Sequence, residues 1–140
     1  MKIQFKIGNS TIVSKVIDGK FPDYANVVPK SNNKILNVRA KDFIQSIERV
    51  ITVSIDRKEG VKVTLEKGNI QLFVNSSSSG EGKETLAANY KDENLTISFN
   101  SRYLLDIASA IEDEKIIINL NDSVSPVLIQ DDSDKHSYYV

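Results

Sequence analysis

The alternation of apolar and polar residues predicts a β-hairpin at the start of the chain. Apolar residues alternate with Lys and Gln over residues 3–7, as in a strand with one apolar face. Turn residues follow at 8–9, and apolar residues return over 12–17. The stretch 29–34 is entirely polar apart from its Pro, which predicts a loop there and a domain boundary between residues 18 and 34.

From residue 35 onward the spacing of apolar residues changes from strand-like to helical and back, and it does so twice. A short alternating stretch is followed by residues 41–52, in which apolar residues recur on one helical face. The second helical stretch, 101–111, opens with a polar Asn100-Ser101 cap. The expected strands are 35–39, 61–66, 70–75, 84–90, 95–99, 116–120, 126–130 and 137–140.

The order β-α-β-β-β therefore occurs twice, which indicates an internal duplication. The two helices match at an offset of 60 residues, which places Phe43 on Tyr103 and Ile47 on Ile107. Any two amphipathic helices can match this well, so the repeated order of elements is the stronger argument. We expect an α+β fold with two helices side by side on one face of antiparallel sheets.

Composition limits the chemistry. The 140 residues are 40% hydrophobic and 26% charged with a net charge of −1, which is typical of a globular domain. Without Cys there is no thiol nucleophile, disulfide or Cys-based zinc site, and a single His, His136, excludes a multi-His metal site. The N-terminus has no apolar signal core, which predicts a cytoplasmic protein. We expect no metal and no cofactor.

Charge is unevenly distributed along the chain. Residues 1–41 hold eight Lys or Arg and two Asp or Glu, a net charge of +6, and residues 42–140 hold ten and seventeen, a net charge of −7. Such segregation can steer a chain toward a charged partner, and it can equally arise by chance on a solvated surface.

Three polar stretches resemble functional motifs only partly. Residues 76–83 lack the spacing of a phosphate-binding loop and are interpreted as a flexible strand connection. Residues 131–134 lack the Gly and the distal Glu of a calcium loop, which favours a solvated turn over a cation site. Residues 112–114 follow a helix end and are interpreted as a solvated connection. His136 is expected to be a half-exposed strand residue. No catalytic motif appears, so a non-catalytic role is favoured.

Three longer stretches together resemble the bacterial sliding clamp, the β subunit of DNA polymerase III. These are residues 14–24 (SKVIDGKFPDY), 99–107 (FNSRYLLDI) and 122–127 (DSVSPV), followed by Tyr-Tyr-Val at 138–140. The resemblance covers essentially the whole chain. It implies a DNA-clamp fold, in which residues 1–22 are the last strands and link of the middle domain. Residues 23–140 would be the third domain without its final tail, so the chain is expected to be a fragment.

The resemblance also implies the function. Family members form a head-to-tail homodimeric ring that encircles double-stranded DNA without reading its sequence. They tether the DNA polymerase III alpha subunit, the clamp loader and repair proteins, and are non-catalytic. Those partners insert short peptides with Gln and paired Leu/Phe anchors into a pocket. The fragment alone is expected to be monomeric.

Site residues are carried over from the family residue by residue. The family's DNA-facing helix surface corresponds here to Lys41 and Arg49, and its ring interface to Val53, Glu81 and Glu84. Asn26 stands where the family often has a basic residue, and Pro126 where many members have Ser or Thr. The peptide-binding positions are Pro22, Val27, Asn100, Tyr103, Val124, Pro126 and Val140.

Two other functions stay open on the sequence alone. The chain is alternatively a free-standing, non-catalytic α+β ligand-binding domain of an unrelated family. An enzyme with an unrecognised carboxylate or Ser site is the third hypothesis, and the lack of a motif argues against it.

Overall fold

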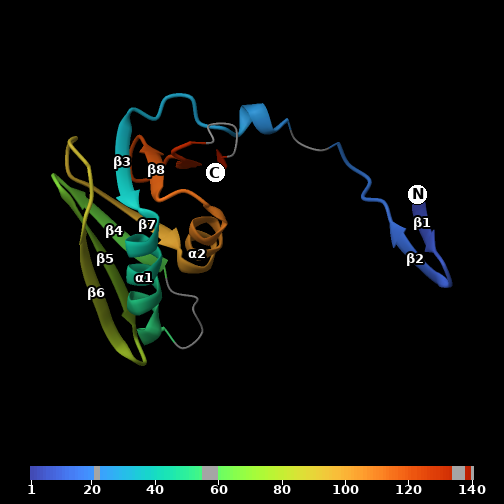
Figure 1. The fold of residues 1–140 in the computed structure, drawn as a ribbon, viewed down its shortest axis with the longest axis horizontal. Helices are drawn as coiled ribbons and strands as arrows, with labels where there is room; N and C mark the ends of the chain where they lie inside the picture. The colour runs from blue at the N-terminus through green and yellow to red at the C-terminus, as the bar shows by residue number, and fades with distance from the viewer. Residues whose placement is uncertain (21–22, 55–59, 134–137, 140) are drawn as a thin grey trace.

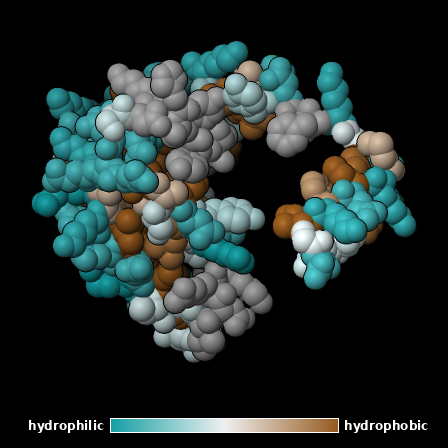
Figure 2. All heavy atoms as spheres, turned by 45° about the vertical axis from the view of Figure 1, so that its right-hand side comes forward, coloured by the Kyte–Doolittle hydropathy of each residue, from teal (hydrophilic) through white to brown (hydrophobic). Residues whose placement is uncertain are grey.

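The computed structural model describes residues 1–20, 23–54, 60–133 and 138–139. The predicted hairpin is present as β1 (Lys2–Ile7) and β2 (Ser10–Lys15), joined by a turn with Gly8 at φ 57. It lies apart from the remaining elements (Figure 1), and apolar residues appear on its surface (Figure 2). Phe5 and Ile12 face each other across the two strands, and both are exposed. Because a lone two-stranded hairpin is marginally stable in water, this apolar face calls for a covering surface.

Two four-stranded antiparallel sheets form the main body. One has the order β6-β5-β4-β7 and the other the order β10-β9-β8-β3. Each sheet contains three strands of one repeat and the first strand of the other repeat. The two repeats are thus interlocked. The strands are β3 (Lys34–Arg39), β4 (Gly60–Glu66), β5 (Asn69–Ser76), β6 (Gly80–Ala87), β7 (Leu95–Asn100), β8 (Lys115–Leu120), β9 (Leu128–Asp131) and β10 (Tyr138–Tyr139).

The two predicted helices lie side by side (Figure 1). They are α1 (Ala40–Val50) and α2 (Ser101–Ala110), and short 3-10 turns occupy Tyr24–Asn26 and Ile51–Val53. Phe43 and Ile47 of α1 and Leu104 of α2 are buried in one core with the inward side chains of the sheets. The strands alternate as expected, with Val61, Val63 and Leu65 of β4 buried. The α+β architecture expected from the repeated pattern is confirmed.

The offset between the two repeats is 61 residues rather than the expected 60. α1 begins at Ala40 and α2 at Ser101, and buried Phe43 matches buried Leu104. Phe43 and Ile44 of α1 match either Tyr103 and Leu104 or Leu104 and Leu105 of α2, so the sequence pattern alone does not distinguish the two offsets. The correct offset places Tyr103 on Asp42, a position that faces away from the core. Tyr103 is accordingly exposed.

Two predicted strands are displaced. The strand expected over 84–90 begins at Gly80, because the turn after β5 is only three residues long and closes at Gly80, whose φ is 104. The Ser-rich stretch is therefore a tight turn that connects β5 and β6. Its interpretation as a strand connection agrees with this. The strand expected over 126–130 runs from Leu128 to Asp131, which buries Asp131. A solvated turn is thus wrong for Asp131, whereas Asp132 and Ser133 are exposed.

Candidate functional site

A pocket of about 280 Å³ opens between the start of α2 and the connection from β8 to β9. A volume of this size accommodates a few side chains rather than a large molecule. One wall comes from β7 and α2, and the other from residues 123–129. The lining residues are Ile97, Ser98, Phe99, Asn100, Tyr103, Leu104, Ile107, Ser123, Val124, Ser125, Pro126, Val127 and Ile129.

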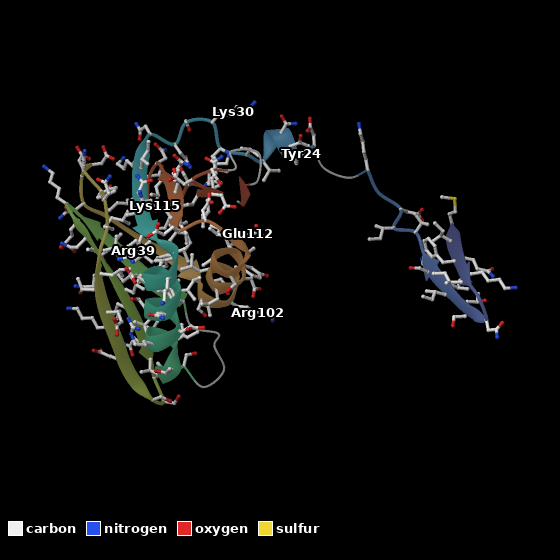
Figure 3. All side chains as sticks on the ribbon, in the orientation of Figure 1. Tyr24, Lys30, Arg39, Arg102, Glu112 and Lys115 are labelled. Atoms are coloured by element: carbon white, nitrogen blue, oxygen red, sulfur yellow. The ribbon has the colours of Figure 1, made fainter. Side chains whose placement is uncertain are left out.

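Asn100 fixes the α2 side of the pocket. Its side-chain Oδ1 accepts hydrogen bonds from the backbone N–H groups of Arg102 (3.0 Å) and Tyr103 (3.3 Å), which caps the helix. In Figure 3, Arg102 lies in the first turn of the helix and Glu112 lies just after its end. The Tyr103 side chain is 65% exposed although it is a large aromatic. An exposed Tyr on a rigid helical turn offers a flat apolar ring and a hydroxyl to a ligand.

The opposite wall is a tight turn built around Asp122. One carboxylate oxygen, Oδ1, accepts hydrogen bonds from the backbone N–H groups of Val124 (2.9 Å) and Ser125 (2.7 Å). The other, Oδ2, accepts from the Ser125 hydroxyl (2.8 Å) and the Asn121 side-chain amide (3.0 Å). These bonds lower the pKa of the Asp122 carboxyl, the Val124 N–H contributing most. The turn presents Val124 with 89% of its surface exposed.

Asn32, just before β3, and Lys34, the first residue of β3, donate hydrogen bonds to the backbone of this wall. The Asn32 side-chain amide donates to the carbonyl oxygens of Asn119 (2.8 Å) and Pro126 (3.0 Å). The Lys34 ammonium donates to the Asn121 carbonyl oxygen at 2.7 Å. The stretch predicted only as a loop therefore also supports the pocket wall.

The structure gathers four of the seven predicted peptide-binding residues in this one pocket: Asn100, Tyr103, Val124 and Pro126. Val27 is exposed at the end of the first 3-10 turn and is not among the lining residues. Pro22 and Val140 lie outside the described residues. Asp122 does not line the pocket and was missed, although Asp followed by Ser three residues later is a recognisable turn signal.

Arg49 and Glu84, predicted for two different surfaces, form an ion pair with each other. Arg49 Nε donates to Glu84 Oε1 at 2.9 Å and Arg49 Nη2 to Oε2 at 3.1 Å, which joins α1 to β6. The hydrogen bond from Arg49 lowers the pKa of the Glu84 carboxyl, and the same bond raises the pKa of Arg49. The pair reduces the free positive charge at Arg49.

The Arg49–Glu84 pair predicts a small pH-dependent contribution to stability. Because the pKa of Glu84 is lowered on folding, the contribution is present above its ordinary value of 4.5 and is lost as the pH falls through the lowered pKa. The melting temperature of Glu84→Gln is expected to lie slightly below that of the unmodified chain at neutral pH and to converge with it in acid. Glu81→Gln, on the opposite face of β6, is the control. A constant difference at all pH values would contradict the assignment.

The other predicted surface residues lie at separate places. Lys41 is exposed in the first turn of α1, where it shares a surface hollow with Glu48 and Glu112. Val53 is partly buried in the second 3-10 turn, and Glu81 is exposed on β6, an edge strand of its sheet.

The remaining acidic residues do not assemble a metal site in the described part of the chain. Within it, no group of three or more Asp, Glu or His residues is arranged to hold a metal ion. Asp113 instead accepts hydrogen bonds from the Ser133 N–H (2.6 Å) and hydroxyl (2.7 Å), so the 112–114 stretch anchors the chain after β9. Among the described residues, no helix is long and apolar enough to cross a membrane.

Sequence comparison gives the family. The sequence model described as "DNA polymerase III beta subunit, C-terminal domain" matches residues 25–140. The chain belongs to this family. The Beta sliding clamp of Caulobacter vibrioides (strain NA1000 / CB15N) is 37% identical over 139 residues, which cover 99% of this chain and 37% of that relative. The chain thus spans little more than a third of the length of the curated relative.

Solved clamp structures have the same fold. A DnaN sliding clamp from Bartonella birtlesii bound to griselimycin is 44% identical with a TM-score of 0.84, over 95% of this chain and 36% of that chain. The beta sliding clamp of Caulobacter crescentus, with PEG bound to its putative beta-motif tethering region, is 37% identical with a TM-score of 0.87, over 99% of this chain and 37% of that one. The family and the clamp fold expected from the sequence are both confirmed.

Proposed function

We propose that this chain acts as part of a DNA replication processivity factor, a sliding clamp that holds partner proteins on double-stranded DNA. Its membership of the DNA polymerase III beta subunit family supports this role. The proposed role is mechanical and non-catalytic, and it is exercised in the cytoplasm.

The observation that carries the proposal is the pocket between α2 and the Asp122 turn. Its walls are mostly apolar, and Asn100, Tyr103 and Ser125 add polar groups at the rim. Apolar walls with a few polar groups suit a short peptide whose apolar side chains enter the pocket. We propose that peptides of the polymerase alpha subunit, the clamp loader and repair proteins bind here, and that Pro22, Val27 and Val140 complete the site.

The Asn100 side chain restricts which polar groups such a peptide presents. Its Oδ1 is occupied by the two N–H groups of α2, so the Nδ2 amide is the group left to face a ligand. A donor at this point selects an acceptor, such as a Gln side-chain oxygen or a peptide carbonyl.

DNA is proposed to contact the helix surface only weakly. Lys41 is an exposed cation on α1, and nearby Glu48 and Glu112 offset its charge. Arg49 contributes less free charge because Glu84 pairs with it. Weak, sequence-independent attraction to phosphates is what a sliding protein needs, since strong phosphate contacts would stop its movement.

The ring contact is proposed at the β6 edge of the sheet. Among the described strands, β6 pairs with β5 alone. An edge strand offers unpaired backbone N–H and C=O groups to a second subunit. Val53, Glu81 and Glu84 lie at or beside this edge, and we propose that they meet the first domain of the next subunit in a head-to-tail dimer.

Residues 1–22, which include the hairpin, are proposed to belong to a preceding domain. The apolar face of the hairpin, which includes Phe5 and Ile12, is exposed, and β1 and β2 contact chiefly each other. Residues 23–140 then form the domain that carries the pocket.

The experiment that tests the peptide-binding role uses fluorescence anisotropy on the 140-residue chain. A labelled peptide with one Gln and a Leu-Phe pair is expected to bind saturably, and a scrambled peptide of the same composition is expected to bind much more weakly. Unlabelled griselimycin is expected to displace the labelled peptide. Absence of saturable binding by a chain shown to be folded by circular dichroism would contradict the pocket assignment.

A further inference from the structure

The wall of the pocket formed by residues 121–127 has an internal support that itself faces away from the ligand space. Asp122 accepts four hydrogen bonds, and none of its atoms lines the pocket. Val124, which it holds, does line the pocket and is 89% exposed. Because the Val124 side chain is exposed, packing does not fix its position. Interactions within the backbone turn must do so.

We propose that Asp122 is a positioning residue for peptide binding: its carboxylate pre-forms the turn that presents Val124 and Pro126, without touching the peptide. This inference rests on the proposed peptide-binding function and adds a residue to it.

Each hydrogen bond fixes a different part of the turn. The bonds to the Val124 and Ser125 N–H groups, 2.9 and 2.7 Å long, fold the backbone around a single oxygen atom. The bond from the Ser125 hydroxyl, 2.8 Å long, holds that side chain at the rim. A carboxylate accepting several N–H and O–H groups is a strong acceptor, because the charge shortens and strengthens each bond.

The lowered pKa of Asp122 agrees with this arrangement. The Val124 N–H, the Ser125 hydroxyl and the Ser125 N–H all stabilise the ionised carboxyl. The ionised form is therefore the one that organises the turn at neutral pH.

The outer supports do not replace Asp122. Asn32 donates to the Pro126 carbonyl oxygen and Lys34 to the Asn121 carbonyl oxygen, so the two ends of the turn are tied to the start of β3 and the residues just before it. Neither Asn32 nor Lys34 accepts a hydrogen bond from the N–H groups of Val124 and Ser125; in the described structure only Asp122 does. Loss of the Asp122 carboxylate would leave the two ends of the turn fixed and its centre, Val124 and Ser125, free to move.

Mobility of Val124 and Ser125 would change the kinetics of peptide binding in a way that can be measured. If the turn has the binding geometry for only a fraction of the time, the apparent dissociation constant rises by the inverse of that fraction. Because the contacts in the complex stay the same, the loss falls on the association rate. Removal of a contacting side chain instead acts mainly through faster dissociation.

The test measures peptide association and dissociation by stopped-flow anisotropy with the labelled Gln and Leu-Phe peptide. Asp122→Ala is expected to raise the dissociation constant about tenfold, mostly through slower association. The dissociation constant of Asp122→Asn is expected to lie between those of Asp122→Ala and the unmodified chain. The Asn side-chain oxygen still accepts hydrogen bonds from both N–H groups, but the second carboxylate oxygen is gone. Asp132→Asn, an exposed acid outside the pocket, is the matched control and should bind like the unmodified chain.

Two results would overturn the proposal. One is unchanged peptide binding by Asp122→Ala. The other is a loss that lies wholly in faster dissociation and is not restored by Asp122→Asn, which would make Asp122 a contact or a general stability residue. Thermal melting of each variant separates a global loss of folding from a local one.

A second measurement keeps this inference distinct from the peptide-binding function. Amide hydrogen exchange at Val124 and Ser125 is expected to be slow in the unmodified chain and fast in Asp122→Ala, with exchange in β8 unchanged. If the unmodified chain binds no peptide, the proposed function fails while the exchange result still decides whether Asp122 orders the turn. Slow exchange at both amides in Asp122→Ala would refute that ordering role.

Discussion

Replacing Tyr103 by Ala is expected to weaken binding of the Gln and Leu-Phe peptide at least about tenfold, equivalent to about 1.4 kcal/mol. The Tyr103 ring is exposed at the first turn of α2, and it lines the pocket opposite Val124. Aromatic residues at such positions give large contact area for little lost conformational freedom. Isothermal titration calorimetry on the two chains measures the difference directly.

Two matched variants define what the Tyr103 result means. Tyr103→Phe keeps the ring and is expected to retain most of the affinity, whereas Ile35→Ala removes an exposed apolar side chain of β3 outside the lining and should change nothing. Val124→Asp, which places a charge on the opposite wall, is expected to weaken binding as strongly as Tyr103→Ala. Equal losses in Ile35→Ala and Tyr103→Ala would show that the peptide does not use this pocket.

Replacing Gly82 by Ala is expected to lower the free energy of unfolding by about 1–3 kcal/mol. A Cβ atom at Gly82 would lie 2.6 Å from the Val50 carbonyl oxygen and 3.2 Å from the Val50 Cα atom. Both are backbone atoms at the end of α1, and Gly82 itself is paired with Val74 in the sheet, so neither side moves away easily. Urea denaturation followed by circular dichroism measures the loss.

Gly19→Ala is the control for Gly82→Ala, because a Cβ atom there has nothing within 4 Å and no positive φ is involved. It is expected to leave the unfolding midpoint of the main body unchanged. Since Gly82 also lacks a positive φ, the expected loss at that position is steric alone. A stability of Gly82→Ala equal to that of the unmodified chain would mean that β6 and α1 separate readily.

The sequence pattern was sufficient for the order of elements and for much of the pocket. Alternation and helical spacing depend on local burial, which one chain displays directly, so the β-α-β-β-β repeat and the hairpin were predictable. Family resemblance supplied Asn100, Tyr103, Val124 and Pro126 together. It could do so because these residues lie in short, recognisable stretches.

The failures have physical causes in particular residues. An error of one residue in matching the helices set Tyr103 against Phe43 instead of Asp42, since neighbouring apolar residues in both helices allow either choice. The pairing of Arg49 with Glu84 joins residues 35 positions apart, and no local pattern contains that information. The position of β6 depended on how tightly the Ser-rich turn closes at Gly80, which composition does not reveal.

The interlocking of the two repeats has a consequence for how the domain acquires its structure. β3 pairs with β8, so Val38 lies opposite Ile116, and β4 pairs with β7, so Val63 lies opposite Ile97. The first repeat cannot complete a four-stranded sheet until the second has been synthesised, because each lends its leading strand to the other. Such long-range pairing slows folding and makes it cooperative. A nascent chain halted after β6 would therefore present an unfinished sheet edge, and co-translational protection of that edge is a requirement built into the topology.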